Sequence, residues 1–248
     1  MKLTSKNIHK HLKKLNLKKG DNVCCHANLF SFGYKEIKIC KYIINNIIKI
    51  IDINQGTLVM PFYRLSGNKK IIQNKFDKKG NSYLYKYFFE NYDVTMSKSL
   101  THPHIGIGKY SNFLKKTSEN TAFGKNSDFE LFEKKKFKLL LLGCTPNEGA
   151  TYLHHLEQIA KVPYRKIKTL YFFKNKKIKY SYNISFKNEY KSNFDIVLKY
   201  LNKKINVADL KFGKSYYISL YNVKKIIYKK LLRNKLLLVK KIENYKTA

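Results

Sequence analysis

The apolar run at residues 139–142, LLLL, restricts the fold of this chain more than any other feature. The run stops at Gly143, and a loop of small residues extends from there to Ala150. A short, unbroken apolar run that ends at a glycine is typical of a strand buried on both faces, as in the parallel sheets of α/β proteins. The run therefore predicts a central strand whose sheet is covered by helices.

Three polar side chains follow at the point where a helix should begin. Thr151, His154 and Glu157 lie three residues apart, which on an α-helix places them within about 120° of its surface. The carboxyl end of a buried strand, with a loop and a helix beside it, is a usual location for the reactive groups of α/β enzymes. A hydroxyl, an imidazole and a carboxylate could therefore serve one pocket.

The remaining chain alternates between helix and strand patterns. Apolar residues recur at helical spacing in residues 8–17, 36–51, 83–90, 194–201 and 223–232. Strand patterns occupy residues 23–27, 58–62, 94–97 and 137–142, and residues 170–186 are typical of a hairpin. Because no Pro- or Gly-rich linker divides the chain, we expect a layered α/β sandwich built as a single domain, residues 1–248.

The charge balance is strongly basic, with 51 Lys+Arg against 16 Asp+Glu and a net charge of +35. A field of this sign attracts nucleic acids, nucleotides and coenzyme A. The lysines are nevertheless spread over the whole chain with abundant Asn and Ile, as an AT-rich genome would produce. No zinc-finger, RNA-recognition or basic-zipper pattern accompanies them. The positive net charge therefore favours a substrate that carries negative charge. Nucleic acid is not the expected partner.

The cysteines and the N-terminal sequence indicate the cellular compartment and whether a metal site is expected. Cys24, Cys25, Cys40 and Cys144 lack the CxxC pairs of zinc sites and the density of a disulfide scaffold. No set of His, Cys, Asp and Glu has metal-ligand spacing, so no metal is expected. The basic N-terminus lacks the apolar core of a signal peptide, and no run approaches the ~18 apolar residues of a membrane span. We expect a cytoplasmic protein with reduced cysteines.

Five further motifs occur in a fixed order along the chain. They are GDNVCCHANLFSFG at 20–33, GTLVMPF at 56–62, MSKSLTH at 96–102, GKNS at 124–127 and KFG at 211–213. Together with the Thr-x-x-His-x-x-Glu pattern, they resemble the landmarks of the aminoglycoside 3-N-acetyltransferase family, which is unrelated to the GNAT acetyltransferases. The resemblance covers nearly the whole chain. It implies a three-layer α/β/α sandwich with a central mixed sheet.

The resemblance also implies acetyl transfer from acetyl-CoA to an amine by direct attack in a ternary complex. An ammonium group has no lone pair, so a base must lie within hydrogen-bond reach of it. His154 is the candidate base, and Glu157, one turn further on, would orient its imidazole. Thr151 or a backbone N–H of residues 144–150 would donate to the thioester oxygen. Cys144 as a covalent nucleophile is the minor alternative.

The resemblance places coenzyme A at the loop that follows residues 23–27, where N–H groups can meet amide and diphosphate oxygens. The candidate donor-site residues are Ala27, Asn28, Leu29, Ser31, Phe32, Gly33, Ser97, Ser99 and Thr101. The chain departs from the family here, because Ala27-Asn28 replaces Ser-Ser and Met96 replaces an arginine. One hydroxyl and one cation are therefore missing, and Lys98 is the candidate replacement for the cation.

The acceptor side departs further from the family. The candidate acceptor-site residues are His26, Phe62, Asp77 and His102. Family members that inactivate aminoglycosides need an acidic pocket, whereas this chain has Lys78, Lys79 and Lys86 in the matching region. Steering by the positive field favours an amine that carries phosphate. The expected acceptor is thus an amino sugar linked to a nucleotide, as in surface-glycan synthesis, and the alternative is an aminoglycoside.

Two other classes of function remain open from the sequence. The chain could be a nucleic-acid-associated protein, or it could bind coenzyme A without turnover. The other histidines are expected to have no role in the chemistry. His155 would point about 100° away from His154 on a helix, and His9, His11 and His104 match no family motif.

Overall fold

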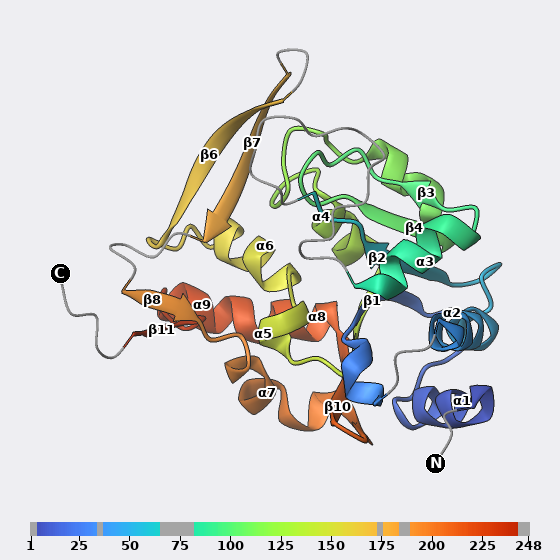
Figure 1. Cartoon of the computed structure of the whole chain (residues 1–248). Coiled ribbons are helices and arrows are strands. Elements are labelled where there is room, and N and C mark those ends of the chain that lie inside the picture. The colour runs from blue at the N-terminus through green and yellow to red at the C-terminus, as the bar shows by residue number, and fades with distance from the viewer. Residues whose placement is uncertain (1–3, 34–36, 65–81, 173–175, 184–188, 243–248) are drawn as a thin grey trace.

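A mixed seven-stranded sheet forms the centre of the protein (Figure 1). The computed structural model describes residues 4–33, 37–64, 82–172, 176–183 and 189–242. The strand order is β3-β4-β2-β1-β5-β10-β9, in which β1 pairs in parallel with β2 and β5. The strands are β1 (Asn22–Ala27), β2 (Thr57–Pro61), β3 (Thr95–Met96), β4 (His104–Gly108), β5 (Lys138–Leu142), β9 (Ile205–Leu210) and β10 (Gly213–Ser219). The β2–β4 and β5–β10 pairs are antiparallel, which makes the sheet mixed as predicted.

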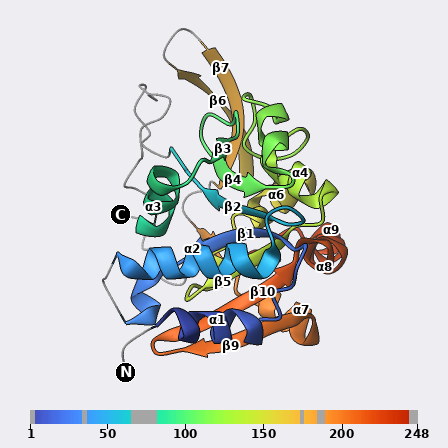
Figure 2. The ribbon, with the colours of Figure 1, turned by 90° about the vertical axis from the view of Figure 1, so that its right-hand side faces the viewer.

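Helices cover both faces of this sheet, because successive side chains of its central strands point to opposite sides. One face packs against α1 (Ser5–Lys14), α2 (Lys38–Ile51) and α3 (Tyr83–Asn91). Figure 2 shows α1 and α2 lying along each other on this side. Leu140 and Leu142 belong to this core, whereas Leu139 and Leu141 belong to the core on the other face. The leucine run of β5 is therefore buried on both faces, as its composition predicts.

The second face carries the helices that position the site. They are α4 (Asp128–Lys134), α6 (Tyr152–Ile159), α7 (Ile196–Leu201), α8 (Leu220–Val223) and α9 (Lys229–Arg233). A π-helical turn, Lys224–Tyr228, joins α8 to α9 where the sequence predicted one helix. The short helix α5 (Pro146–Gly149) leads from β5 into α6. None of the helices in the described ranges has the length and apolar character of a membrane span.

Two small sheets lie outside the central one. The hairpin β6 (Arg165–Phe172) and β7 (Lys176–Asn183) confirms the pattern at residues 170–186, although it begins five residues earlier. Figure 1 shows that it extends away from the body of the molecule beyond α6. The other sheet pairs β8 (Tyr190–Ser192) with β11 (Val239–Lys241).

Several elements were not predicted, and their sequences show why. β4 contains Gly106 and Gly108, which are poor strand formers. A Cβ on Gly106 would lie 2.6 Å from Val59 Cγ1 on the neighbouring strand, so close strand packing requires glycine there. α4 begins at Ser127, whose hydroxyl accepts from the N–H of Glu130. That Ser-x-x-Glu pattern is a helix-start signal that the apolar periodicity did not reveal.

The loops after β1 and β5 meet at one edge of the sheet. Ala27 and Leu142 are paired in register, and the N–H of Asn28 donates to the carbonyl of Leu142. Gly143 has φ 67, and a Cβ there would lie 2.5 Å from Cβ of Ser31. Only glycine allows this left-handed turn and this close approach. The loop predicted to hold coenzyme A therefore packs directly on the segment that leads to α6.

The two-sided burial of β5 generates a stability prediction. Leu141 is fully buried, so Leu141→Ala should reduce the free energy of unfolding by about 2–5 kcal/mol. Leu232→Ala is the matched control, because Leu232 is 47% exposed. Urea denaturation of both variants measures the difference. Equal losses in the two variants would contradict a core position for β5.

Candidate active site

His154 and Glu157 lie together on α6, as their spacing predicts. The Nδ1 atom of His154 is 2.8 Å from Oε2 of Glu157. The Glu157 side chain is fully buried, whereas 24% of the His154 side chain is exposed. The imidazole therefore has one edge on a buried carboxylate and keeps partial access to solvent. A histidine that acts as a general base and is oriented by a carboxylate requires this geometry.

Two residues that the sequence analysis did not single out complete this cluster. The hydroxyl of Tyr164 donates to Oε1 of Glu157 at 2.8 Å, and Nε of Arg165 donates to Oε2 at 2.6 Å. The guanidinium of Arg165 also contacts Nδ1 of His154. A buried carboxylate needs such donors because its charge has lost its water. A buried Glu157 requires hydrogen-bond donors, and this requirement is the signal by which they could have been sought. The sequence directly after α6, Val162-Pro-Tyr-Arg165, contains two such donors.

The cluster holds His154 neutral at neutral pH. Burial lowers the pKa of His154, the hydrogen bond to Glu157 raises it, and the charge of Arg165 lowers it again, so that it ends below its ordinary value. Burial alone would raise the pKa of Glu157. The hydrogen bonds and charges of His154 and Arg165 reverse this and lower it. Glu157 is therefore ionised beside an unprotonated imidazole, which can accept a proton.

Aromatic rings surround the imidazole. The centroids of Phe194 and Phe123 lie 4.8 and 5.8 Å from that of His154. His102 lies 5.0 Å from the Phe123 ring, and burial lowers its pKa to about 3. His102 is partly buried, so its predicted place in the wall of the site agrees with the geometry. Thr151 directly precedes α6, is partly buried, and lies near Tyr63.

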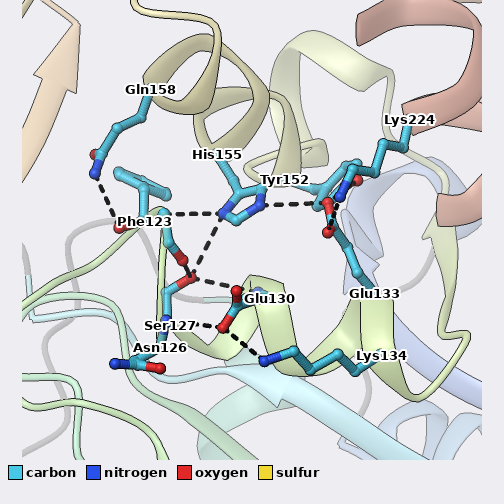
Figure 3. Close-up of polar contacts among 11 residues, drawn as sticks. Phe123, Asn126, Ser127, Glu130, Glu133, Lys134, Tyr152, His155, Gln158 and Lys224 are labelled. Atoms are coloured by element: carbon cyan, nitrogen blue, oxygen red, sulfur yellow. Dashed lines mark hydrogen bonds and ion pairs between the residues drawn. The ribbon is translucent and has the colours of Figure 1, made fainter.

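The opposite side of α6 is fixed by a separate polar network (Figure 3). His155 Nδ1 accepts from the N–H of Gly124 at 3.0 Å, and its Nε2 lies 3.3 Å from Oε1 of Glu133. The Tyr152 hydroxyl donates to the same oxygen at 2.6 Å, and Gln158 Nε2 donates to the carbonyl of Phe123 at 3.0 Å. His155 is thus buried on the far side from His154, as expected. The network fixes the rotation of α6, and with it the direction of the base.

Glu133 is the centre of that network. Burial would raise its pKa, but hydrogen bonds from His155, Lys224 and Tyr152 lower it to about 2. Glu133 is therefore ionised over the whole working pH range. Because its donors come from α6 and from the turn after α8, the carboxylate joins these segments to α4, as Figure 3 shows.

The predicted donor loop has less free hydrogen-bonding capacity than its sequence suggested. The backbone N–H groups at residues 27, 28, 30, 31 and 33 already donate inside the protein. The Asn28 side chain caps the 3₁₀ turn Leu29–Phe32, and the Ser31 hydroxyl donates to the carbonyl of Gly143. Phe32 is buried and Ala27 nearly so, whereas Leu29 is partly exposed. Binding of coenzyme A by these N–H groups stays a prediction, and most of them already have a partner within the protein.

The three hydroxyls predicted on the other side of the donor are also directed inward. Ser97 donates to Oδ2 of Asp128 at 2.6 Å, and its single proton is thereby used. Ser99 accepts from the N–H of His102, and Thr101 hydrogen-bonds with the same imidazole. All three are buried, at 5, 2 and 4% exposure. They hold the segment that carries His102, and their contact with coenzyme A stays a prediction.

The remaining predicted residues differ in their surroundings. Phe62 is buried against Phe89, and His26 is buried, with burial lowering its pKa to about 3. Both side chains are buried, and their contact with an acceptor stays a prediction. Asp77, with the basic residues 78 and 79, lies outside the described residues. Lys86 lies on α3 and pairs with Glu90 at 3.7 Å.

His104, which the sequence analysis left without a role, lies in a buried pair. Its Nδ1 atom is 2.8 Å from Oδ2 of Asp128, and both side chains are almost completely buried. The Ser97 hydroxyl binds the same oxygen. This pair joins β4 to α4, below the aromatic wall. Within the described ranges, no group of three or more His, Cys, Asp or Glu converges as a metal site would.

The comparisons with known proteins agree with this arrangement. The model of the aminoglycoside 3-N-acetyltransferase family matches residues 26–227, which is most of the chain. The chain belongs to this family. The predicted family and acetyl-CoA-dependent N-acetyl transfer are thereby confirmed. A comparison with curated proteins finds no match.

Several solved structures share the fold of this family member. The apoenzyme of the aminoglycoside acetyltransferase AAC(3)-IVa is 16% identical, with a TM-score of 0.77 over 94% of this chain and 90% of the other. The YokD protein from Bacillus subtilis is 20% identical, with a TM-score of 0.76 over 94% of this chain and 100% of the other. AAC-IIIb in a binary complex with CoASH is 15% identical, with a TM-score of 0.73 over 93% and 97%. The predicted three-layer fold is confirmed.

The cysteines of this acetyltransferase provide a test of the mechanism. All four are free and buried, and burial raises the pKa of Cys144 to about 12. The thiolate is the reactive form of cysteine, so iodoacetamide at pH 8 should leave the folded protein unmodified and active. Mass spectrometry should find all four thiols alkylated after denaturation. Rapid alkylation of Cys144 with loss of transfer would restore the covalent alternative.

Proposed function

We propose that this enzyme acetylates an amine directly, with His154 as the general base. The amine nitrogen attacks the thioester carbon, a C–N bond forms, and the C–S bond breaks as the thiolate leaves with its electron pair. Nε2 of His154 takes the proton that the nitrogen releases, and the imidazolium returns it to the thiolate. What supports this proposal is the 2.8 Å contact that places Nδ1 on the ionised Glu157 and leaves the other ring nitrogen for the substrate.

The developing oxyanion needs a hydrogen-bond donor, and Thr151 is the one we propose. The alternative was a backbone N–H of residues 144–150. Those of residues 145 and 147–150 already donate within the protein. The Thr151 hydroxyl can donate to the oxyanion because its proton rotates about the C–O bond. We further propose that residues 1–248 act as one catalytic domain.

The proposed acceptor is an amine of an aminoglycoside. Two structural neighbours support it, since a mutant of AAC(3)-IVa was solved in complex with a gentamicin and AAC-VIa was solved with sisomicin. The net charge of +35 supports the second candidate, an amino sugar linked to a nucleotide. A polycation approaching this protein is repelled, whereas an amine that carries phosphates is attracted. The two candidates therefore differ in how salt changes their transfer rates.

The role of His154 can be tested by His154→Ala. Loss of a general base should lower kcat by about 10²–10⁴-fold while the affinity for acetyl-CoA stays near that of the native enzyme. In the native enzyme, burial lowers the pKa of His154, so the loss of activity in acid should begin at a lower pH than an ordinary histidine base would give. His9→Ala, on α1, is the control. Native turnover by folded His154→Ala would remove it from the mechanism.

The acceptor can be identified by thiol release from acetyl-CoA with sisomicin and with a nucleotide-linked amino sugar. We expect turnover of sisomicin whose kcat/KM rises with added salt, because salt screens the repulsion between like charges. The nucleotide-linked sugar should be a poorer substrate. Higher efficiency with that sugar, decreasing as salt is added, would replace the aminoglycoside by the second candidate.

A further inference from the structure

Arginine is rare in this chain, and one of its few arginines lies in the site. Only Arg64, Arg165 and Arg233 occur among 51 basic residues, so lysine is used nearly everywhere else. Arg165 is the first residue of β6, and only 3% of its side chain is exposed. A lysine would supply the same charge but no planar fork of donors. Arginine at this buried position therefore indicates that the direction of its N–H groups matters.

The guanidinium and the imidazole share one carboxylate oxygen. Oε2 of Glu157 lies 2.6 Å from Nε of Arg165 and 2.8 Å from Nδ1 of His154. Arg165 also contacts Nδ1 directly, and its guanidinium carbon lies 5.7 Å from the centroid of the Phe123 ring. Nε donates to Glu157, and the guanidinium lies against the Phe123 ring. This fixes the cation beside the imidazole.

We propose that Arg165 is a positioning residue of the acetyl transfer. It serves as the permanent counter-ion of Glu157, and it thereby keeps His154 neutral, with Nε2 directed at the amine. The inference rests on the proposed role of His154 as the base. Without Arg165, the unbalanced charge of Glu157 would stabilise the imidazolium, and a protonated imidazole cannot take a proton from the substrate.

The other groups that face His154 do not replace this effect. His102 is uncharged at working pH, because burial lowers its pKa to about 3. Tyr164 donates to Oε1 of Glu157 and brings no charge, and burial and Glu157 raise its pKa. Phe123 and Phe194 contribute apolar rings. Burial lowers the pKa of His154 most, and beside it the charge state of His154 depends on the opposing effects of Glu157 and Arg165.

Arg165→Gln tests the proposal by removing the charge while keeping an amide donor. The pKa of His154 should rise by about one unit or more, which is roughly a tenfold gain in proton affinity. NMR titration of histidine-labelled protein measures it directly, with the His154 signal assigned by its loss in His154→Ala. The acid limb of the kcat/KM profile should move to higher pH by the same amount. Arg165→Lys should leave the limb in place but lower kcat.

Lys199→Gln is the matched control, because it removes one positive charge from an exposed position on α7. Neither the titration nor the acid limb should move in it. Folded Arg165→Gln with an unmoved His154 pKa would overturn the proposal. If His154→Ala retained full turnover while Arg165→Gln still moved the titration, the base would be wrong and the effect of Arg165 would stand.

A double variant keeps the test possible if Arg165→Gln does not fold. Glu157→Gln/Arg165→Gln removes both buried charges, so it leaves no unpaired ion in the interior. The imidazole then lacks its fixed partner, and kcat should fall at least tenfold while the KM for acetyl-CoA changes little. Native kcat in this double variant would show that the pair does not position His154.

Discussion

The buried carboxylate of Glu157 is the constraint on which the site depends. A charge that has lost its water must be met by donors, and the chain supplies them from three positions, His154, Tyr164 and Arg165. These positions lie on α6, on the segment that follows it and on the first residue of β6. Satisfying one carboxylate therefore fixes the path of the chain after α6, and the same contacts produce a neutral imidazole with one free nitrogen.

The fold could be predicted from the sequence where apolar periodicity was strong. The leucines of β5 and the isoleucines of α2 identify their elements because burial alone determines their pattern. The sequence analysis missed β4 and β10 because their amino-acid composition alone does not identify them as strands. They are strands because they pair with neighbouring strands of the sheet. The π-helical turn before α9 gave no signal, since its residues fit an ordinary helix equally well.

The site could be predicted only in part. The spacing of His154 and Glu157 gave their contact, because both lie on one helix. Arg165 could not be placed in the same way, since its distance from Glu157 depends on how the chain turns after α6. The internal hydrogen bonds of the predicted donor residues could not be foreseen for a different reason. A serine looks available in a sequence, but Ser97 and Ser31 are each bonded to a group distant in the chain, which only the folded structure brings near.

The adjacent histidines of α6 have a consequence for how this protein can vary. His154 faces the site, and His155 is bonded to Gly124 and Glu133 in the interior. Inserting one residue before them would turn His154 into the direction of His155, toward the core, whereas deleting one would turn His155 into the direction of His154, toward the site. Length changes are therefore excluded between Gly143 and α6. Sequence changes that adapt the protein to new acceptors must instead occur in segments that His154 and His155 do not fix in place.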